Sequence, residues 1–164
     1  SEGRTMKLTA TREQILGPVQ SVIGVVERRQ TMPVLSNVLL SARNNRLSVT
    51  GTDLEVELVA STEVQVQQAG DVTVPGRKLL DICRALPEGT QMTLITEADR
   101  VTVRGGRSRF TLSTLPAAEF PVIEEINTQL TLSVAQADFR RLIDKTHFSM
   151  AQQDVRYYLN GMLL

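Results

Sequence analysis

Few side chains in this sequence of 164 residues could carry out catalysis. His147 is the only histidine and Cys83 the only cysteine, so a zinc site built from several such ligands is excluded. Cys83 falls on the apolar face of a predicted helix, where core packing is the expected role. The single histidine is likewise expected to be structural. These residues predict no catalytic site, no metal and no cofactor.

Three carboxylates form the next candidate. Asp53, Glu55 and Glu57 alternate with apolar residues, as is typical of a strand with one solvated face. We expect a solvent-exposed face, and an enzyme that holds a metal ion on these three side chains stays open as an alternative. Phosphate-loop and dinucleotide-binding motifs are absent, since Gly105-Gly106 lies between two predicted strands and begins no helix.

The basic residues say more about function, because they recur on the polar sides and at the ends of predicted helices. They are Arg77 with Arg84, Arg141 with Lys145, Arg28 with Arg29, and Arg156 beside Tyr157 and Tyr158. Basic side chains next to aromatic ones suit contact with a nucleic-acid backbone and exposed bases. The alternative is that these are ordinary solvent-facing helix charges, among which Asp81 and Asp144 dilute the signal.

Composition limits the class of protein. Lys and Arg together number 18, as do Asp and Glu, and this zero net charge argues against a general nucleic-acid binder. The sequence has neither an apolar run long enough to span a membrane nor a signal-peptide core, so we expect a cytoplasmic protein. Residues 1–5 precede Met6, the expected natural start, and are interpreted as an expression remnant.

Hydrophobic periodicity predicts an α+β fold in which one order of elements occurs twice: strand, helix, three strands. Thr11 is expected to cap the first helix and Pro18 to bend or break it. Asn44-Asn45 and Gly105-Gly106 are the expected hairpin turns. The predicted elements are strands Lys7–Ala10, Val34–Ala42, Arg46–Thr50, Leu54–Ser61 and Val72–Val74, a helix over Arg77–Leu86, and strands Gln91–Thr96, Arg100–Arg104 and Arg109–Thr114.

A third, incomplete unit is predicted after a linker near Pro121–Asn127. Its expected helix spans Gln136–Met150, and its apolar residues match those of the first unit at a constant offset, with Leu8 against Leu132 and Leu35 against Leu159. That any two helix–strand units look alike is the open alternative. Because the matched unit stops before its last two strands, we expect the chain to be truncated.

Five stretches of the sequence resemble the bacterial DNA sliding clamp, the beta subunit of DNA polymerase III. They are Thr50–Glu57 (TGTDLEVE), Val74–Lys78 (VPGRK), Asp81–Gly89 (DICRALPEG), Gly106–Ala117 (GRSRFTLSTLPA) and Met150–Gly161 (MAQQDVRYYLNG). The likeness covers essentially all of residues 6–164. It implies the clamp fold, with helices on one face of curved antiparallel sheets, an N-terminal domain over 6–126 and the start of a central domain over 127–164.

The resemblance also implies a non-catalytic role. Clamp subunits pair head to tail into a ring that encircles duplex DNA and tethers the replicative polymerase. The implied partners are double-stranded DNA, the DNA polymerase III catalytic subunit, the clamp loader, other clamp-binding proteins and a second copy of the chain, with no membrane. A protein-interaction module that keeps this fold without working on DNA is the competing hypothesis.

Site residues follow from the same resemblance, motif by motif. Residues implied to contact DNA are Arg29, Arg77, Gln153, Tyr157 and Tyr158. Part of the pocket for client peptides is implied at Arg156 and Leu159, with the rest beyond Leu164. The first-domain half of the subunit interface is implied at Lys78, Arg107, Arg109, Phe110 and Leu112, and the last two are expected to form an exposed apolar patch. Glu27–Gln30 departs from the glycines common in the family and makes the loop that carries Arg29 more charged.

Overall fold

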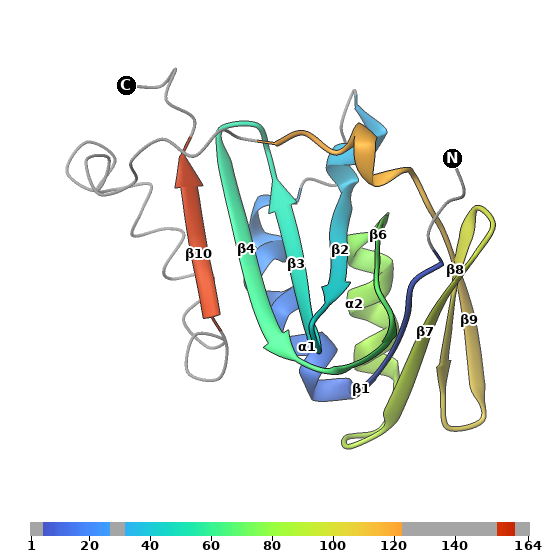
Figure 1. Ribbon diagram of the computed structural model, residues 1–164. Helices are drawn as coiled ribbons and strands as arrows, with labels where there is room; N and C mark the ends of the chain where they lie inside the picture. Colours follow the sequence, from blue (N-terminus) through green and yellow to red (C-terminus); the bar gives the residue numbers. More distant parts are fainter. Residues whose placement is uncertain (1–4, 27–31, 123–153, 160–164) are drawn as a thin grey trace.

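Two five-stranded antiparallel sheets account for the strands in the part of the chain that the computed structural model describes, residues 5–26, 32–122 and 154–159. Sheet A has the order β5-β1-β7-β8-β9 and sheet B the order β10-β4-β3-β2-β6 (Figure 1). The strands are β1 (Lys7–Thr11), β2 (Asn37–Arg43), β3 (Arg46–Thr52), β4 (Val56–Glu63), β5 (Gln65–Gln68), β6 (Gly70–Pro75), β7 (Gln91–Glu97), β8 (Arg100–Gly105), β9 (Ser108–Ser113) and β10 (Asp154–Leu159).

The predicted repeat is present, and its two units exchange their first strands. β1 pairs with β7 of the second unit and, on its other side, with β5, while β6 pairs with β2 of the first unit. Each sheet therefore contains strands of both units, which makes one domain of them. The order of strand, helix and three strands is confirmed in both units, and β5 is an additional short edge strand that periodicity did not predict.

Helices α1 (Arg12–Val22) and α2 (Gly76–Ala85) pack against each other on the same side of sheet B (Figure 1). α1 contacts β3 and β4, whereas α2 contacts β2, β6 and β9. The buried side chains of both helices and both sheets form one continuous apolar core, including Ile15, Val19, Leu79 and Cys83. This arrangement confirms the predicted fold class of helices on one face of antiparallel sheets.

The first helix begins as predicted, but it is not broken at Pro18. Thr11 accepts a hydrogen bond from the backbone of Gln14, whose side chain bonds back to Thr11, and together these bonds form a capping box. The helix continues through Pro18 to Val22 and is followed by the 3-10 turn η1 (Ile23–Val25). Pro18 is itself buried, so tertiary packing offsets the backbone bond that proline cannot make.

Strand boundaries differ from prediction where local backbone geometry prevails over apolar content. Residues Pro33–Ser36 form the 3-10 helix η2, so the strand predicted from Val34 begins only at Asn37. Leu54 has φ of 77°, a conformation incompatible with a strand, and β4 starts at Val56. The Asn44-Asn45 turn is confirmed, with φ of 53° and 55°.

The second predicted hairpin turn is displaced by one residue. Gly105 is the last residue of β8 and pairs with Ser108, so Gly106 and Arg107 form the turn. Gly106 has φ of 57°, whereas a Cβ atom on Gly105 would lie 2.7 Å from the Leu86 side chain. The two glycines therefore serve different needs, close packing at Gly105 and backbone conformation at Gly106.

The linker and helix predicted over 121–150 lie almost wholly outside the described residues. A further 3-10 turn, η3 (Ala117–Glu119), precedes them. β10 is described and adds to the outer edge of sheet B by pairing antiparallel with β4. Leu159 ends this strand, while its predicted counterpart Leu35 lies in η2, so the proposed repeat does not match structurally at that position.

Candidate functional site

Arg77 lies in the first turn of α2, where the chain leaves β6 through Pro75. Its Nη2 donates a hydrogen bond of 3.0 Å to the carbonyl oxygen of Val26, the residue after η1. Its Nε is buried and has no hydrogen-bond partner among the described residues. The guanidinium is thus half-buried and attached to the segment that precedes residues 27–31.

Arg84 lies seven residues further along α2 and is exposed. Two helical turns separate it from Arg77, so both side chains leave the helix on one stripe, away from buried Leu79 and Cys83. Of the other predicted basic and DNA-contacting positions, Arg28, Arg29, Arg141, Lys145 and Gln153 lie outside the described residues. The common basic stripe is therefore seen on α2 alone.

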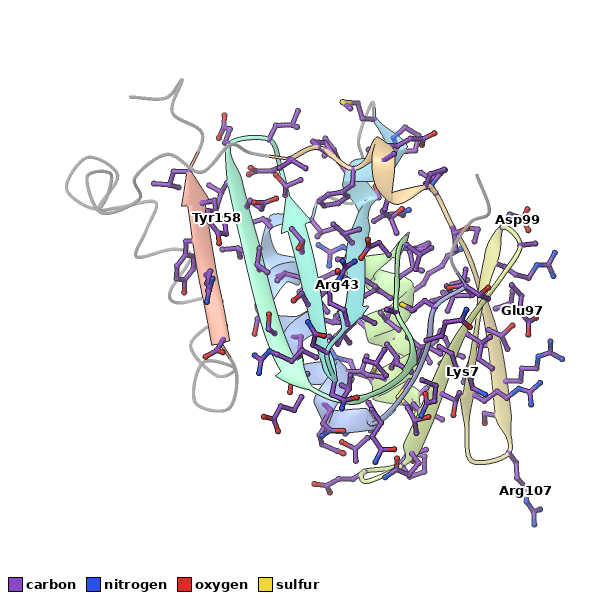
Figure 2. The ribbon with its side chains drawn as sticks, in the orientation of Figure 1. Lys7, Arg43, Glu97, Asp99, Arg107 and Tyr158 are labelled. Atoms are coloured by element: carbon purple, nitrogen blue, oxygen red, sulfur yellow. The ribbon has the colours of Figure 1, made fainter. Side chains whose placement is uncertain are left out.

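Tyr157 and Tyr158 are brought to the edge of sheet B by β10. Tyr157 lies opposite Leu58, which is fully buried, and packs against the core on the helix side. Tyr158 lies opposite Glu57 on the outer face (Figure 2). Because successive strand residues point to opposite faces, the two tyrosines project from opposite sides of the sheet.

Arg156 and Leu159 share this strand and also face opposite sides. Arg156 is exposed and lies opposite Val59, whereas Leu159 is half-buried opposite Val56. Only Arg156 is on the outer face with Tyr158. The structure thus places both residues predicted for a peptide pocket at the sheet edge, without bringing their side chains together.

The residues predicted for a subunit interface lie mainly on β9, which among the described residues is one of the two edge strands of sheet A. Arg107 and Arg109 are exposed, and Figure 2 shows Arg107 at the outer end of the β8–β9 hairpin. Lys78 is exposed on α2 and Phe110 is half-buried. The expected apolar patch is wrong at Leu112, which is only 2% exposed and belongs to the core. Alternation along the strand turns both Phe110 and Leu112 towards the core, where Phe110 is partly buried.

The three carboxylates do not form the expected solvated strand face. Asp53 lies before β4, and its Oδ1 accepts backbone hydrogen bonds from Glu55 at 2.9 Å and Val56 at 2.8 Å. Glu57 is buried, with 8% exposure, and this burial raises the pKa of its carboxyl. Only Glu55 is solvent-exposed as predicted. Within the described ranges, no group of three or more metal-ligating side chains occurs.

Cys83 lies in the core, as its helical position predicted. Burial raises the pKa of its thiol to about 12, which keeps it neutral and unreactive. His147 is outside the described residues. Among the residues that the structure describes, no helix is both long and apolar enough to cross a membrane.

One contact of this region was not predicted. Arg46 on β3 forms an ion pair with Asp154 on β10, with 3.1 Å between Nη2 and Oδ2, although β4 lies between the two strands. The residues are 108 positions apart in the chain. No local sequence pattern predicts this ion pair, because it forms only when the folded sheet brings β3 and β10 close together.

Similarity to known proteins is extensive. A family model described as DNA polymerase III beta subunit, N-terminal domain, matches residues 6–124. The beta sliding clamp of Pseudomonas aeruginosa is 58% identical over 160 residues, covering 97% of this chain and 44% of that protein. The beta sliding clamp of Escherichia coli is 52% identical over 159 residues, covering 96% of this chain and 43% of that protein. The chain thus spans less than half the length of these relatives.

Solved structures agree with the sequence matches. A Pseudomonas aeruginosa sliding clamp bound to griselimycin superposes with a TM-score of 0.73 at 52% identity, over 91% of this chain and 41% of that one. The DNA polymerase sliding clamp of Caulobacter crescentus gives a TM-score of 0.72 at 43% identity, over 74% of this chain and 34% of that one. The two sheets and paired helices are therefore shared with these proteins.

Proposed function

The chain belongs to the family of the DNA polymerase III beta subunit, whose N-terminal domain matches residues 6–124, and we propose that the protein acts as a sliding clamp. In this proposal it is a non-catalytic processivity factor of the cytoplasm. Two copies close into a ring around duplex DNA and tether the DNA polymerase III catalytic subunit. The clamp loader and other clamp-binding proteins are its further partners.

The single observation that carries this proposal is the 58% identity with a beta sliding clamp over 97% of the chain. Physical chemistry supports it. A sliding protein must contact phosphates weakly and read no bases, so a few scattered cations serve better than a strongly basic surface. The zero net charge and the modest basic stripe of α2 fit this requirement.

In the ring, we assign DNA contact to Arg29, Arg77, Gln153, Tyr157 and Tyr158. Arg77 is hydrogen-bonded to Val26, which lies shortly before Arg29 in the sequence, and we propose that the two arginines act on one stretch of DNA backbone. The two tyrosines contribute unequally, since β10 presents them on opposite faces. Residues 6–126 form the N-terminal domain and 127–164 the beginning of the central one.

Subunit pairing is assigned to the free edge of β9. Within the described part of the chain, β9 pairs with a strand on one side only, so its outward backbone groups can continue sheet A into a second copy. Arg109 lies directly opposite Arg104 on β8, and like charges placed so closely favour an acidic partner surface. Arg107 and Phe110 belong to the same hairpin, Lys78 lies on helix α2, which contacts β9, and Leu112 supports this edge from within the core. Arg156 and Leu159 contribute to the client-peptide pocket.

Salt-dependent DNA binding by the full-length protein tests this function. Arg29→Ala and Arg77→Ala should each weaken binding uniformly across DNA sequences and reduce the slope of log affinity against log salt by about 1. Arg43→Ala is the matched control, because Arg43 is an exposed arginine on the outer face of sheet B. Equal effects at Arg43 and Arg77, or none at Arg29 and Arg77, would favour an interaction module that does not work on DNA.

A further inference from the structure

β9 is an edge strand whose shape suits pairing with a second copy of itself. It has six residues and pairs only with β8 in the described part of the chain, and half-buried Phe110 lies beside buried Leu112 on its inner face. Such edges readily pair with the same edge of another molecule. Identical subunits most often associate through one patch that contacts itself. A head-to-tail ring requires the opposite, because β9 must then meet a different surface.

Symmetric pairing of two β9 strands would be antiparallel and would keep each side chain on its own face of the sheet. In the register centred on Phe110, the Phe110 side chains of the two copies would lie opposite each other and gain apolar contact. Arg109 would then lie opposite Thr111 of the second copy and diagonal to its Arg109, at about 7–8 Å. The register that brings the aromatic rings together therefore also brings the arginines together.

The charge of the β8–β9 hairpin extends this repulsion to other registers. Residues 100–113 contain four arginines and no carboxylate. Arg104 lies directly opposite Arg109, and both are exposed on the face of sheet A that points away from buried Val103, so a second positive charge stands behind the edge. Arg107 adds a third positive charge in the turn. Any pairing of two β9 edges would place two such hairpins side by side.

No acidic side chain among the described residues neutralises these three charges. Arg104, Arg107 and Arg109 form no ion pair within the described ranges, whereas Arg100, at the start of β8, has its Nε 3.8 Å from Oδ1 of Asp99. Figure 2 shows Asp99 and Arg107 at opposite ends of this strand. The carboxylate therefore lies too far away to screen the arginines near the β8–β9 turn.

We propose that Arg104, Arg107 and Arg109 are specificity-determining residues of assembly, which prevent two β9 edges from pairing with each other. An edge that repels its own copy stays available to a surface of opposite charge. That this surface belongs to a second subunit rests on the proposed function, whereas the exclusion of self-pairing rests only on the strand pairing and charges of this chain. Arg104 is new to the residues assigned to this edge, since it lies on β8 and acts from its position opposite Arg109.

Sedimentation equilibrium of the 164-residue chain at low ionic strength tests the proposal, because charge repulsion is least screened there. The parent chain should be monomeric or nearly so, with association that strengthens as salt is added. Arg104→Gln with Arg109→Gln removes the facing pair of charges and should tighten the dimer constant by about tenfold, as expected when a few like-charge cross-strand contacts are relieved. Association of this double variant should also lose its dependence on salt.

Matched variants separate the effect of charge from the effects of side-chain identity and position. Arg104→Lys with Arg109→Lys keeps both charges and should behave as the parent does. Arg43→Gln with Arg84→Gln removes two exposed charges away from β9 and should change the dimer constant little. Added to the double glutamine variant, Thr111→Lys returns one positive charge to the edge and should restore the monomer, whereas Thr111→Gln should not.

Far-UV circular dichroism verifies the fold of each variant. The proposal would be overturned if the double glutamine variant associates no more strongly than the parent, including the case in which neither chain dimerises. An equal gain in the Arg43 and Arg84 control, or a dimer that persists after Thr111→Lys, would overturn it as well. The measurement uses neither DNA nor a closed ring, so failure of the clamp function in other assays would not change its result.

Discussion

The guanidinium of Arg77 donates a 3.0 Å hydrogen bond to the carbonyl oxygen of Val26, which joins the first turn of α2 to the end of the α1–η1 segment. The bond connects two units of the repeat whose helices already pack together. Arg77 therefore has a structural role that precedes any contact with DNA. Its effects on stability and on binding must be measured separately.

Arg77→Ala should lower the free energy of unfolding by about 1.5–3 kcal/mol, the range for a hydrogen bond from a charged group. Arg84→Ala, on the same stripe but exposed, should change it by less than about 0.5 kcal/mol. Urea denaturation followed by circular dichroism gives both values. Equal losses for the two variants would show that the bond to Val26 contributes nothing specific.

Glu57→Gln should stabilise the protein at neutral pH. Burial raises the folded-state pKa of Glu57 above the ordinary value of 4.5, so its proton is bound more tightly in the folded state. The contribution of the neutral carboxyl to the free energy of unfolding is fully present below pH 4.5. It is lost as the pH rises through the raised folded-state pKa. A neutral glutamine avoids this loss.

The gain from Glu57→Gln should accordingly vanish when unfolding is measured at or below about pH 4.5. Glu55→Gln is the control, because Glu55 is exposed, and it should have little effect at either pH. A gain that persists unchanged in acid would mean that shape or hydrogen bonding, rather than charge burial, explains it.

The Cys83 thiol should resist alkylation in the folded protein. Its pKa is raised by burial from 9.0 to about 12, which lowers the thiolate fraction at pH 8 by about a thousandfold. The stability from the neutral thiol is present below pH 9 and is lost as pH rises through about 12. Iodoacetamide labelling followed by mass spectrometry should therefore be slow natively and rapid in urea. Fast native labelling would place Cys83 outside the core.

Substitutions at Phe110 and Leu112 should affect subunit assembly and folding to different extents. Leu112→Ala should lower the free energy of unfolding by about 2–5 kcal/mol, because Leu112 is fully packed in the core. Phe110→Ala should weaken dimerisation of the full-length protein, by up to about 3 kcal/mol, and should lower the free energy of unfolding by less than Leu112→Ala, because Phe110 is only half-buried against the same core. Sedimentation equilibrium measures the dimer constant. An unchanged constant in Phe110→Ala would contradict the assignment of β9 to the subunit interface.

Local sequence patterns predicted the fold well at positions where a residue type strongly prefers one local structure or environment. Thr11 with Gln14 predicted the helix start, and Asn44-Asn45 predicted the hairpin turn. Cys83 on an apolar helical face predicted burial. Each of these outcomes depends on side chains within about one turn of one another, so the sequence alone contains the necessary information.

Prediction failed where tertiary structure overrides the local pattern. Alternation made Glu57 look solvated, yet it is only 8% exposed, and Leu54 takes a left-handed backbone conformation in place of a strand. The exchange of β1 and β6 between the two units has no local signature. The Arg46–Asp154 ion pair has no local signature either, since it can form only when β10 pairs with β4.

Retention on circular DNA tests the clamp function most directly. The full-length protein, loaded by its clamp loader onto a nicked plasmid, should remain bound through gel filtration in high salt, because a closed ring is held by enclosure and not by phosphate contacts. Linearising the plasmid with a restriction enzyme should then release it from the DNA ends. Equal retention on circular and linear DNA, or loss from both in salt, would contradict encirclement.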